Sequence, residues 1–189
     1  MPIEIVEQPI SELAEHQKVS IAFQVDAILH IEEAGNSLAF IDRRVDPPYV
    51  KDYDVLEPPL TWSHRFDVSQ WGLLVAFLDG QRLGGAVIAF ETPNLTILEG
   101  CNDVAALWDI RVDPARRRQG IGTALFRAAE DWAASRNCKE LRIETQNTNL
   151  AACRFYEGLW CRLRAINPGV YPDRPDEIQL IWSRRPRPL

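Results

Sequence analysis

The sequence of 189 residues lacks an apolar run near the roughly 20 residues that a membrane-spanning helix needs. Its first ten residues have neither the basic stretch nor the apolar core of a secretion signal, so we expect a cytoplasmic location. The three histidines are too dispersed to indicate a metal site. The four cysteines form no Cys-x-x-Cys pair, which favours buried, reduced thiols over disulfides or metal ligands.

The composition is that of an ordinary acidic globular protein, with 46% hydrophobic residues and a net charge of −6. This charge argues against nucleic acid and anionic membranes as partners, and it is compatible with a cationic one. The length suits one hydrophobic core. We predict a single domain over residues 1–183, followed by a basic tail over residues 184–189.

The most informative stretch is VAALWDIRVDPARRRQGIGTAL, residues 104–125. A strand-forming run ends at Asp113-Pro114, three arginines and two glycines follow, and a helical pattern of apolar residues begins at once. The first amides of a helix have no internal partner and carry the positive end of its dipole. Glycines let an anion approach these amides closely, so strand, turn and helix together predict a phosphate site.

This stretch has one bland interpretation, and it departs from two other phosphate-binding motifs. Three arginines before a helix are often only a solvated surface cluster. A Walker loop needs Lys-Ser or Lys-Thr after its second glycine, and no such sequence occurs. The dinucleotide fingerprint needs a third glycine where Leu125 stands.

The remaining periodicities predict alternating strands and helices around a sheet. Strands are expected over residues 3–6, 19–31, 71–78, 83–90, 104–112, 141–144 and 178–182, and helices near residues 11–13, 119–135 and 149–157. We expect a bulge at Gly84-Gly85, an irregular loop over residues 42–60 and another turn-rich loop reaching Pro175. Alternation assigns Trp108 and Asp109 to opposite faces of the central strand.

Two segments together resemble the GNAT N-acetyltransferase superfamily. The first, Arg117-Arg118-Gln119-Gly120-Ile121-Gly122, is similar to the acyl-CoA signature of that family. The second is the run ETQNTNLAACRFYE over residues 144–157. With the preceding DIRVD, this pattern is most similar to the streptothricin acetyltransferase branch. The strong resemblance covers about residues 104–157.

The resemblance implies an α/β fold whose mixed, largely antiparallel sheet is flanked by helices, with two central strands that splay apart. It also implies acetyl-CoA as the acyl donor and no metal. The pyrophosphate would be held by backbone amides and arginine side chains of Arg117, Arg118, Gln119, Gly120, Ile121, Gly122 and Thr123. The pantetheine arm would pair with the strand at Ile110 and Val112, and Asn149 would form a hydrogen bond with it.

Acetyl transfer to an amine requires a group that removes a proton from the ammonium, directly or through water. Asp109 is the first candidate and Glu99 the second. The alternative for Asp109 is a structural pair with an arginine such as Arg111. Tyr156 stands at the family's general-acid position, where it would protonate the CoA thiolate. Its alternative is packing of the helix together with Phe155.

We therefore predict an N-acetyltransferase acting on a primary amine of a small molecule, of which a streptothricin-type antibiotic is one example. A protein lysine or N-terminal acetyltransferase and a non-catalytic acyl-CoA sensor stay open as alternatives. The family leaves a homodimer open, although no apolar stripe in the sequence indicates one. One departure is Trp160, which stands where the family commonly has glycine, so the turn after the second helix is expected to differ.

Overall fold

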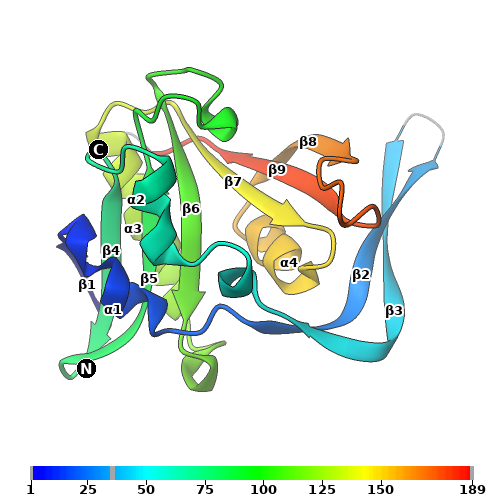
Figure 1. Ribbon diagram of the computed structural model, residues 1–189, viewed down its shortest axis with the longest axis horizontal. Coiled ribbons are helices and arrows are strands. Elements are labelled where there is room, and N and C mark those ends of the chain that lie inside the picture. The colour runs from blue at the N-terminus through cyan, green and yellow to red at the C-terminus, as the bar shows by residue number, and fades with distance from the viewer. Residues whose placement is uncertain (1, 35–36, 188–189) are drawn as a thin grey trace. The chain divides into compact units, whose positions relative to one another are not determined.

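The computed structural model describes residues 2–34 and 37–187. The chain forms two compact units. The first comprises the described parts of Met1–Ile21, Tyr53–Ile143 and Arg184–Leu189, and the second Ala22–Asp52 and Glu144–Ser183. We describe each unit by itself, because their positions relative to one another are not determined (Figure 1).

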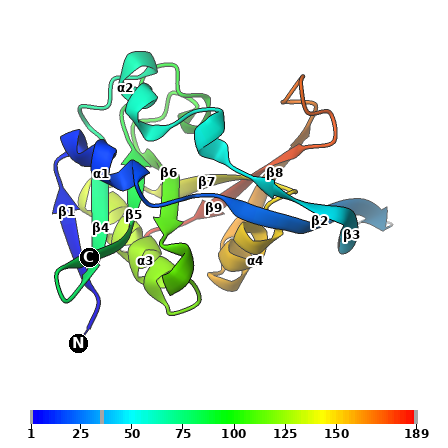
Figure 2. The same cartoon turned by 60° about the horizontal axis from the view of Figure 1, so that its bottom comes forward.

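The first unit is built on an antiparallel sheet with the strand order β1-β4-β5-β6. Its strands are β1 (Glu4–Gln8), β4 (Gly72–Leu78), β5 (Gln81–Ala89), β6 (Val104–Val112) and the start of β7 (Glu140–Gln146), which is parallel to β6. Helices α1 (Leu13–Gln17) and α2 (Trp62–Arg65) lie on one side of this sheet, and α3 (Ile121–Ser135) lies on the other (Figures 1 and 2). Short 3-10 turns occur at Ile10–Glu12, Tyr53–Val55, Pro59–Thr61, Thr96–Leu98 and Pro114–Arg116.

Helix α3 covers its side of the sheet with the apolar stripe predicted from its spacing. Ile121, Leu125 and Phe126 are buried, each contributing about 1.5–3 kcal/mol when removed from water. The helix starts at Ile121, two residues later than predicted. The backbone at Arg118 and Gly120 is left-handed, with φ of 65° and 83°, and this conformation does not continue into a helix.

Two bulges interrupt the antiparallel ladders. In the β4–β5 hairpin, Leu83 is the extra residue, next to the predicted bulge at Gly84-Gly85. In β6, Asp109 pairs with Val87 and Leu107 with Ile88, so Trp108 is extra.

The bulge in β6 makes the predicted alternation wrong, because it shifts the period of two by one residue. The Trp108 ring lies 6.3 Å from that of Trp62 in α2, and the Asp109 side chain contacts His16 in α1. Both residues therefore face the side of the sheet that carries α1 and α2.

The second unit contains the hairpin β2 (Phe23–Ala34) and β3 (Ser37–Lys51), the helix α4 (Leu150–Gly158), and the end of β7 beside β9 (Ile178–Arg184) and β8 (Arg162–Pro168). The prediction of an irregular loop over residues 42–60 is wrong for residues 42–51, because residues 37–51 form a strand that pairs with β2. Pro47 and Pro48 fall where the register jumps from Val25–Tyr49 to Ala27–Arg44, so the ladder does not need their missing amides.

Two features near the C-terminus differ from expectation. Strand β8 replaces part of the predicted turn-rich loop; none of its side chains is fully buried, so its apolar signal is weak. Arg184 belongs to β9, where its Nε donates to Glu130 Oε1 at 2.8 Å, rather than to the predicted tail. Residues 188–189 of that tail lie outside the described residues.

The turn after α4 keeps the conformation that a glycine would adopt. Trp160 has φ of 61°, and 81% of its surface is exposed. A side chain in this region is strained, which explains why glycine is favoured there. The backbone therefore turns at Trp160 in the conformation that glycine favours, contrary to the expectation from the sequence.

Candidate active site

A buried cluster of charged side chains joins the central strand to the N-terminal helix in the first unit. The Asp109 carboxylate accepts two hydrogen bonds from Arg111, Nε to Oδ1 at 2.9 Å and Nη2 to Oδ2 at 2.6 Å. His16 Nε2 lies 2.7 Å from Asp109 Oδ1. Only 7% of the Asp109 surface and 2% of the Arg111 surface are exposed, so these charges have left water and depend on one another.

Arg111 also fixes two segments that pass over the sheet. Its Nη1 and Nη2 donate to Asp54 at 2.9 and 3.1 Å, and Nη1 donates to the Val19 carbonyl at 3.1 Å. A guanidinium has five N–H donors in a planar fork, so one side chain can serve two carboxylates and a carbonyl.

This environment determines the acidity of Asp109. Burial alone would raise the pKa of its carboxyl, but the hydrogen bonds and charges of Arg111 and His16 outweigh burial and hold that pKa well below its usual range. The pair with Arg111, left as an alternative in the sequence, is thus present. A carboxylate with such a low pKa takes up a proton less readily than an ordinary aspartate.

His16 is a site residue that the sequence did not reveal. It is fully buried, and its Nδ1 has no hydrogen-bond partner among the described residues. A Cβ on Gly85 would lie 2.7 Å from that nitrogen, so glycine is required for the imidazole to sit there. The ring presents Nε2 to the Asp109 carboxylate, so a proton on Nε2 is donated to Oδ1.

Glu99, the second candidate base, belongs to another cluster. It follows the turn Thr96–Leu98 with a left-handed φ of 53°. Its Oε2 lies 3.0 Å from Nη1 of the buried Arg142, which also contacts Glu140. Glu99 is therefore an exposed carboxylate with a cationic neighbour.

The predicted phosphate turn follows β6 in the same unit. Asp113 caps the turn Pro114–Arg116 by accepting a hydrogen bond from the Ala115 amide. Left-handed residues Arg118 and Gly120 then alternate with right-handed or extended ones, a backbone form that turns successive amides toward one point. The first helical bond of α3 runs from Ala124 to the Gly120 carbonyl, which leaves the preceding amides for another acceptor.

The Arg117 side chain binds two backbone carbonyls beside this turn. Its Nε donates to the Val112 carbonyl at 3.2 Å and its Nη2 to the Ser20 carbonyl at 3.1 Å. The side chain thus fixes the turn onto the strand and the N-terminal segment. Arg116 and Arg118 are exposed and provide the positive charge beside the amides.

The strand beside the turn has the expected register. The pairs between β6 and β7 run from Val104 to Leu107, whereas β6 itself continues to Val112. Ile110 and Val112 therefore lie beyond the last β6–β7 pair.

The other two predicted site residues, Asn149 and Tyr156, lie in the second unit. Asn149 is the N-cap of α4, where its Oδ1 accepts a hydrogen bond from the Ala152 amide at 3.1 Å. This cap uses the side-chain oxygen and leaves the N–H donors of the amide for another group. Tyr156 is buried in α4, and its ring lies 5.1 Å from that of Phe155, so the packing contact left as an alternative exists.

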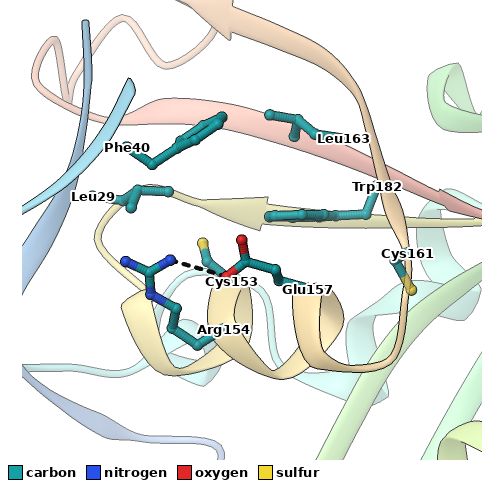
Figure 3. Close-up of a pocket in the computed structure, with 8 residues that line it drawn as sticks. All are labelled: Leu29, Phe40, Cys153, Arg154, Glu157, Cys161, Leu163 and Trp182. Carbon is teal, nitrogen blue, oxygen red and sulfur yellow. Dashed lines mark hydrogen bonds and ion pairs between the residues drawn. The ribbon is translucent and has the colours of Figure 1, made fainter. Parts of the chain in front are cut away.

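A small cavity lies beside α4 in the second unit. It is lined by Leu29, Phe40, Cys153, Arg154, Glu157, Cys161, Leu163 and Trp182, and the Arg154–Glu157 ion pair stands at one side (Figure 3). Burial raises the pKa of the Cys153 thiol to about 11, so it is not a nucleophile near neutral pH.

Two further findings concern the described part of the chain. The cysteines there are free thiols, of which Cys138, Cys153 and Cys161 are buried, as expected from the sequence. Within residues 2–34 and 37–187, no group of three or more His, Cys, Asp or Glu side chains is arranged to hold a metal ion, and no helix is long and apolar enough to span a membrane.

The fold and the turn after β6 define a class of enzyme. Residues 38–159 match the model of the acetyltransferase (GNAT) family, and the chain belongs to that family. The protein is therefore an N-acetyltransferase with acetyl-CoA as its acyl donor, as the sequence predicted.

Individual relatives show which branch of the acetyltransferase family the chain resembles. The chain is 27% identical to streptothricin acetyltransferase A of Bacillus subtilis (strain 168) over 145 residues, which cover 76% of this chain and 77% of the relative. It is 26% identical to the streptothricin acetyltransferase of Escherichia coli over 185 residues, covering 96% and 94%. A crystal structure of an acetyltransferase from Bacillus anthracis str. Ames in complex with acetyl coenzyme A matches with a TM-score of 0.78 and 26% identity over 97% of this chain and 99% of that one. The likeness to the streptothricin branch is thus confirmed.

Proposed function

We propose that this enzyme transfers the acetyl group of acetyl-CoA to a primary amine of a streptothricin-type small molecule. The observation that carries this proposal is the alignment with the Escherichia coli streptothricin acetyltransferase, which covers 96% of the chain and so includes the loops around the phosphate turn. The net charge of −6 also suits a cationic acceptor.

In the proposed reaction, the acceptor ammonium first loses a proton. The free amine then attacks the thioester carbonyl, and a tetrahedral intermediate with a negatively charged oxygen forms. A backbone amide near Ile110 stabilises this oxygen. The oxyanion then collapses and the C–S bond breaks while the new C–N bond is kept, and Tyr156 gives its proton to the departing thiolate. The nitrogen gives up its second proton to the Tyr156 phenolate, directly or through water, so that an amide, free CoA thiol and neutral Tyr156 result.

The proposed binding and base residues are those predicted from the sequence. The amides of the turn from Arg117 to Thr123 hold the pyrophosphate, with Arg116 and Arg118 beside them. Ile110, Val112 and Asn149 hold the pantetheine arm. The base is Asp109, acting directly or through water, or Glu99.

The test is thiol release from acetyl-CoA against streptothricin, polyamines, aminoglycosides and lysine peptides. We expect fast turnover with streptothricin and slow turnover with peptides. Preferential turnover of a lysine peptide or a protein N-terminus would replace the proposal with a protein acetyltransferase. Binding of CoA without turnover of any amine would favour the non-catalytic sensor.

Gly120→Asp is expected to weaken acetyl-CoA binding by at least about tenfold, because a carboxylate would face the pyrophosphate and the left-handed φ of 83° disfavours a side chain. Isothermal titration with CoA measures the effect. Gly120→Asn is the matched control, since asparagine has the same shape without the charge and tolerates this backbone region. Equal affinity of Gly120→Asp and the wild type would place the pyrophosphate elsewhere.

A further inference from the structure

The cavity beside α4 has a volume of about 180 Å³ (Figure 3). Leu29 and Phe40 reach it from the β2–β3 hairpin. The rest of its lining comes from α4, β8, β9 and Cys161, the residue before β8. All of these segments belong to the second unit, so the cavity is a feature of that unit alone.

The register of the hairpin directs its apolar side chains into the cavity. Leu29 pairs with Asp42 across the hairpin, and Phe40 stands two residues before Asp42, so these three side chains share one face. The Asp42 carboxylate accepts a hydrogen bond from Arg154 Nη2 at 2.7 Å, which shows that this face is the one toward α4. Ile41, between Phe40 and Asp42, lies on the opposite face.

The inner wall of the cavity is apolar and held in place by contacts within the protein. Leu29, Cys153 and Trp182 are buried. The Trp182 ring is fixed by its Nε1, which donates to Thr145 Oγ1 at 2.8 Å, and Cys153 Sγ lies 3.6 Å from the same oxygen. The Cys153 thiol is neutral near pH 7, because burial raises its pKa to about 11. Such a wall suits an apolar ligand better than water, which needs about two to four polar partners.

The mouth of the cavity is polar and carries more negative than positive charge. Arg154 Nη1 donates to Glu157 Oε2 at 2.9 Å and Nη2 to Asp42, so one guanidinium faces two carboxylates. The Phe40 side chain forms an apolar edge beside them, with 37% of its surface exposed. A ligand that enters here therefore meets an excess of negative charge, which disfavours a carboxylate on the ligand.

We propose that this cavity binds a small, uncharged aromatic molecule with one ring and one hydroxyl, of the size of benzyl alcohol. The ring packs against Trp182 and Phe40, and the hydroxyl reaches the Arg154–Glu157 ion pair at the mouth. A dry cavity of about 150 Å³ takes up benzene, so the volume suits one substituted ring. The lining includes none of the residues assigned to acetyl-CoA or to acetyl transfer, so the inference does not depend on the proposed function.

The experiment is isothermal titration of benzyl alcohol and of benzoate into the full chain saturated with CoA, so that the acyl-donor site is filled. We expect benzyl alcohol to bind the wild type with a Kd of about 0.1–1 mM, a usual range for so few atoms. Benzoate has nearly the same shape but carries a negative charge. It should bind at least about tenfold more weakly.

Leu163→Phe is the variant that fills the cavity. Leu163 is half-buried at its edge, so the larger ring can enter the space that the ligand would occupy. We expect the affinity for benzyl alcohol to fall at least about tenfold. Ile41→Phe is the matched control, because it adds the same ring to the same unit on the opposite face of the hairpin. Its affinity should stay within about twofold of the wild type.

A second variant covers the case in which Leu163→Phe does not fold. Phe40→Ala removes an aromatic wall at the mouth without adding bulk, and the partial exposure of Phe40 makes the change tolerable. We expect benzyl alcohol to bind about three- to tenfold more weakly. Circular dichroism and the unfolding midpoint show which variants are folded.

Each outcome bears on the site or on its ligand. No binding of benzyl alcohol to the wild type up to about 10 mM, or wild-type affinity in a folded Leu163→Phe or Phe40→Ala, would overturn the site. Equal affinity for benzoate and benzyl alcohol would overturn the assignment of an uncharged ligand. Loss of binding in Leu163→Phe with retained binding in Ile41→Phe supports the proposal. Because thiol release is not measured, a failure of the proposed function leaves this result unchanged.

Discussion

Replacing Asp109 with alanine is expected to lower the free energy of unfolding by about 3–5 kcal/mol, the usual cost of breaking a buried ion pair. The substitution leaves Arg111 charged and buried with one of its two carboxylate partners, and it removes the carboxylate that lies against His16 Nε2. Urea denaturation of the wild type and the variant measures the difference.

Asp54→Ala is the control for this prediction. Asp54 also pairs with Arg111 through two hydrogen bonds, but its side chain is 19% exposed, so water can replace the lost contact. We expect a loss of about 1–2 kcal/mol there. A loss under about 1 kcal/mol in Asp109→Ala would show that the cluster contributes little to stability.

The same pair has a defined pH dependence. The pKa of Asp109 is lowered in the folded protein, so its contribution to stability is fully present above the unfolded pKa of about 3.9. That contribution is lost as the pH falls below this value toward the folded pKa. The stability difference between the wild type and Asp109→Ala should therefore be constant from about pH 5 upward and shrink in acid. A difference that grew on acidification would contradict the assignment.

Tyr156→Phe is expected to lower kcat by about 100-fold or more, because general acid catalysis by a positioned side chain contributes about 10²–10⁴-fold. The variant keeps the buried ring and its contact with Phe155, so α4 should stay packed. Acetyl-CoA affinity should not change, since the phosphate turn lies in the first unit. Stopped-flow measurement of thiol release gives kcat, and titration with CoA gives the affinity.

Two controls make the Tyr156 result decisive. The unfolding midpoint should be near that of the wild type, which separates a lost proton donor from a damaged helix. Phe155→Leu perturbs the neighbouring ring without removing a hydroxyl, and it should lower kcat far less. An unchanged kcat in Tyr156→Phe would mean that the thiolate leaves without this acid and that Tyr156 serves only the packing of α4.

The predictable part of the fold is the part with local signals. Strand β6, the turn around Gly120 and helix α3 follow one another, and each is specified by residues next to it in the chain. Helix α4 was predicted for the same reason, as its N-cap Asn149 and its apolar residues are contiguous. Sequence patterns of this kind need no knowledge of which distant segments meet.

The unpredicted part depends on distant segments. His16 and Asp109 are 93 positions apart, and no periodicity links a lone histidine to a strand carboxylate. The bulge at Trp108 is a property of the β5–β6 ladder, so the alternation within β6 could not reveal it. Strand β3 was missed because its prolines suggested a loop, whereas pairing with β2 accommodates them at a change of register.

The segment from His16 to Ser20 connects the central strand β6 to the phosphate turn within the first unit. His16 bonds to Asp109 and the Val19 carbonyl to Arg111, both on β6, while the Ser20 carbonyl holds Arg117 in the phosphate turn. A displacement of this segment would therefore move the central strand and the turn together. Substitutions in this segment are therefore expected to change the affinity for the acyl donor from a distance, through the position of the turn that holds it.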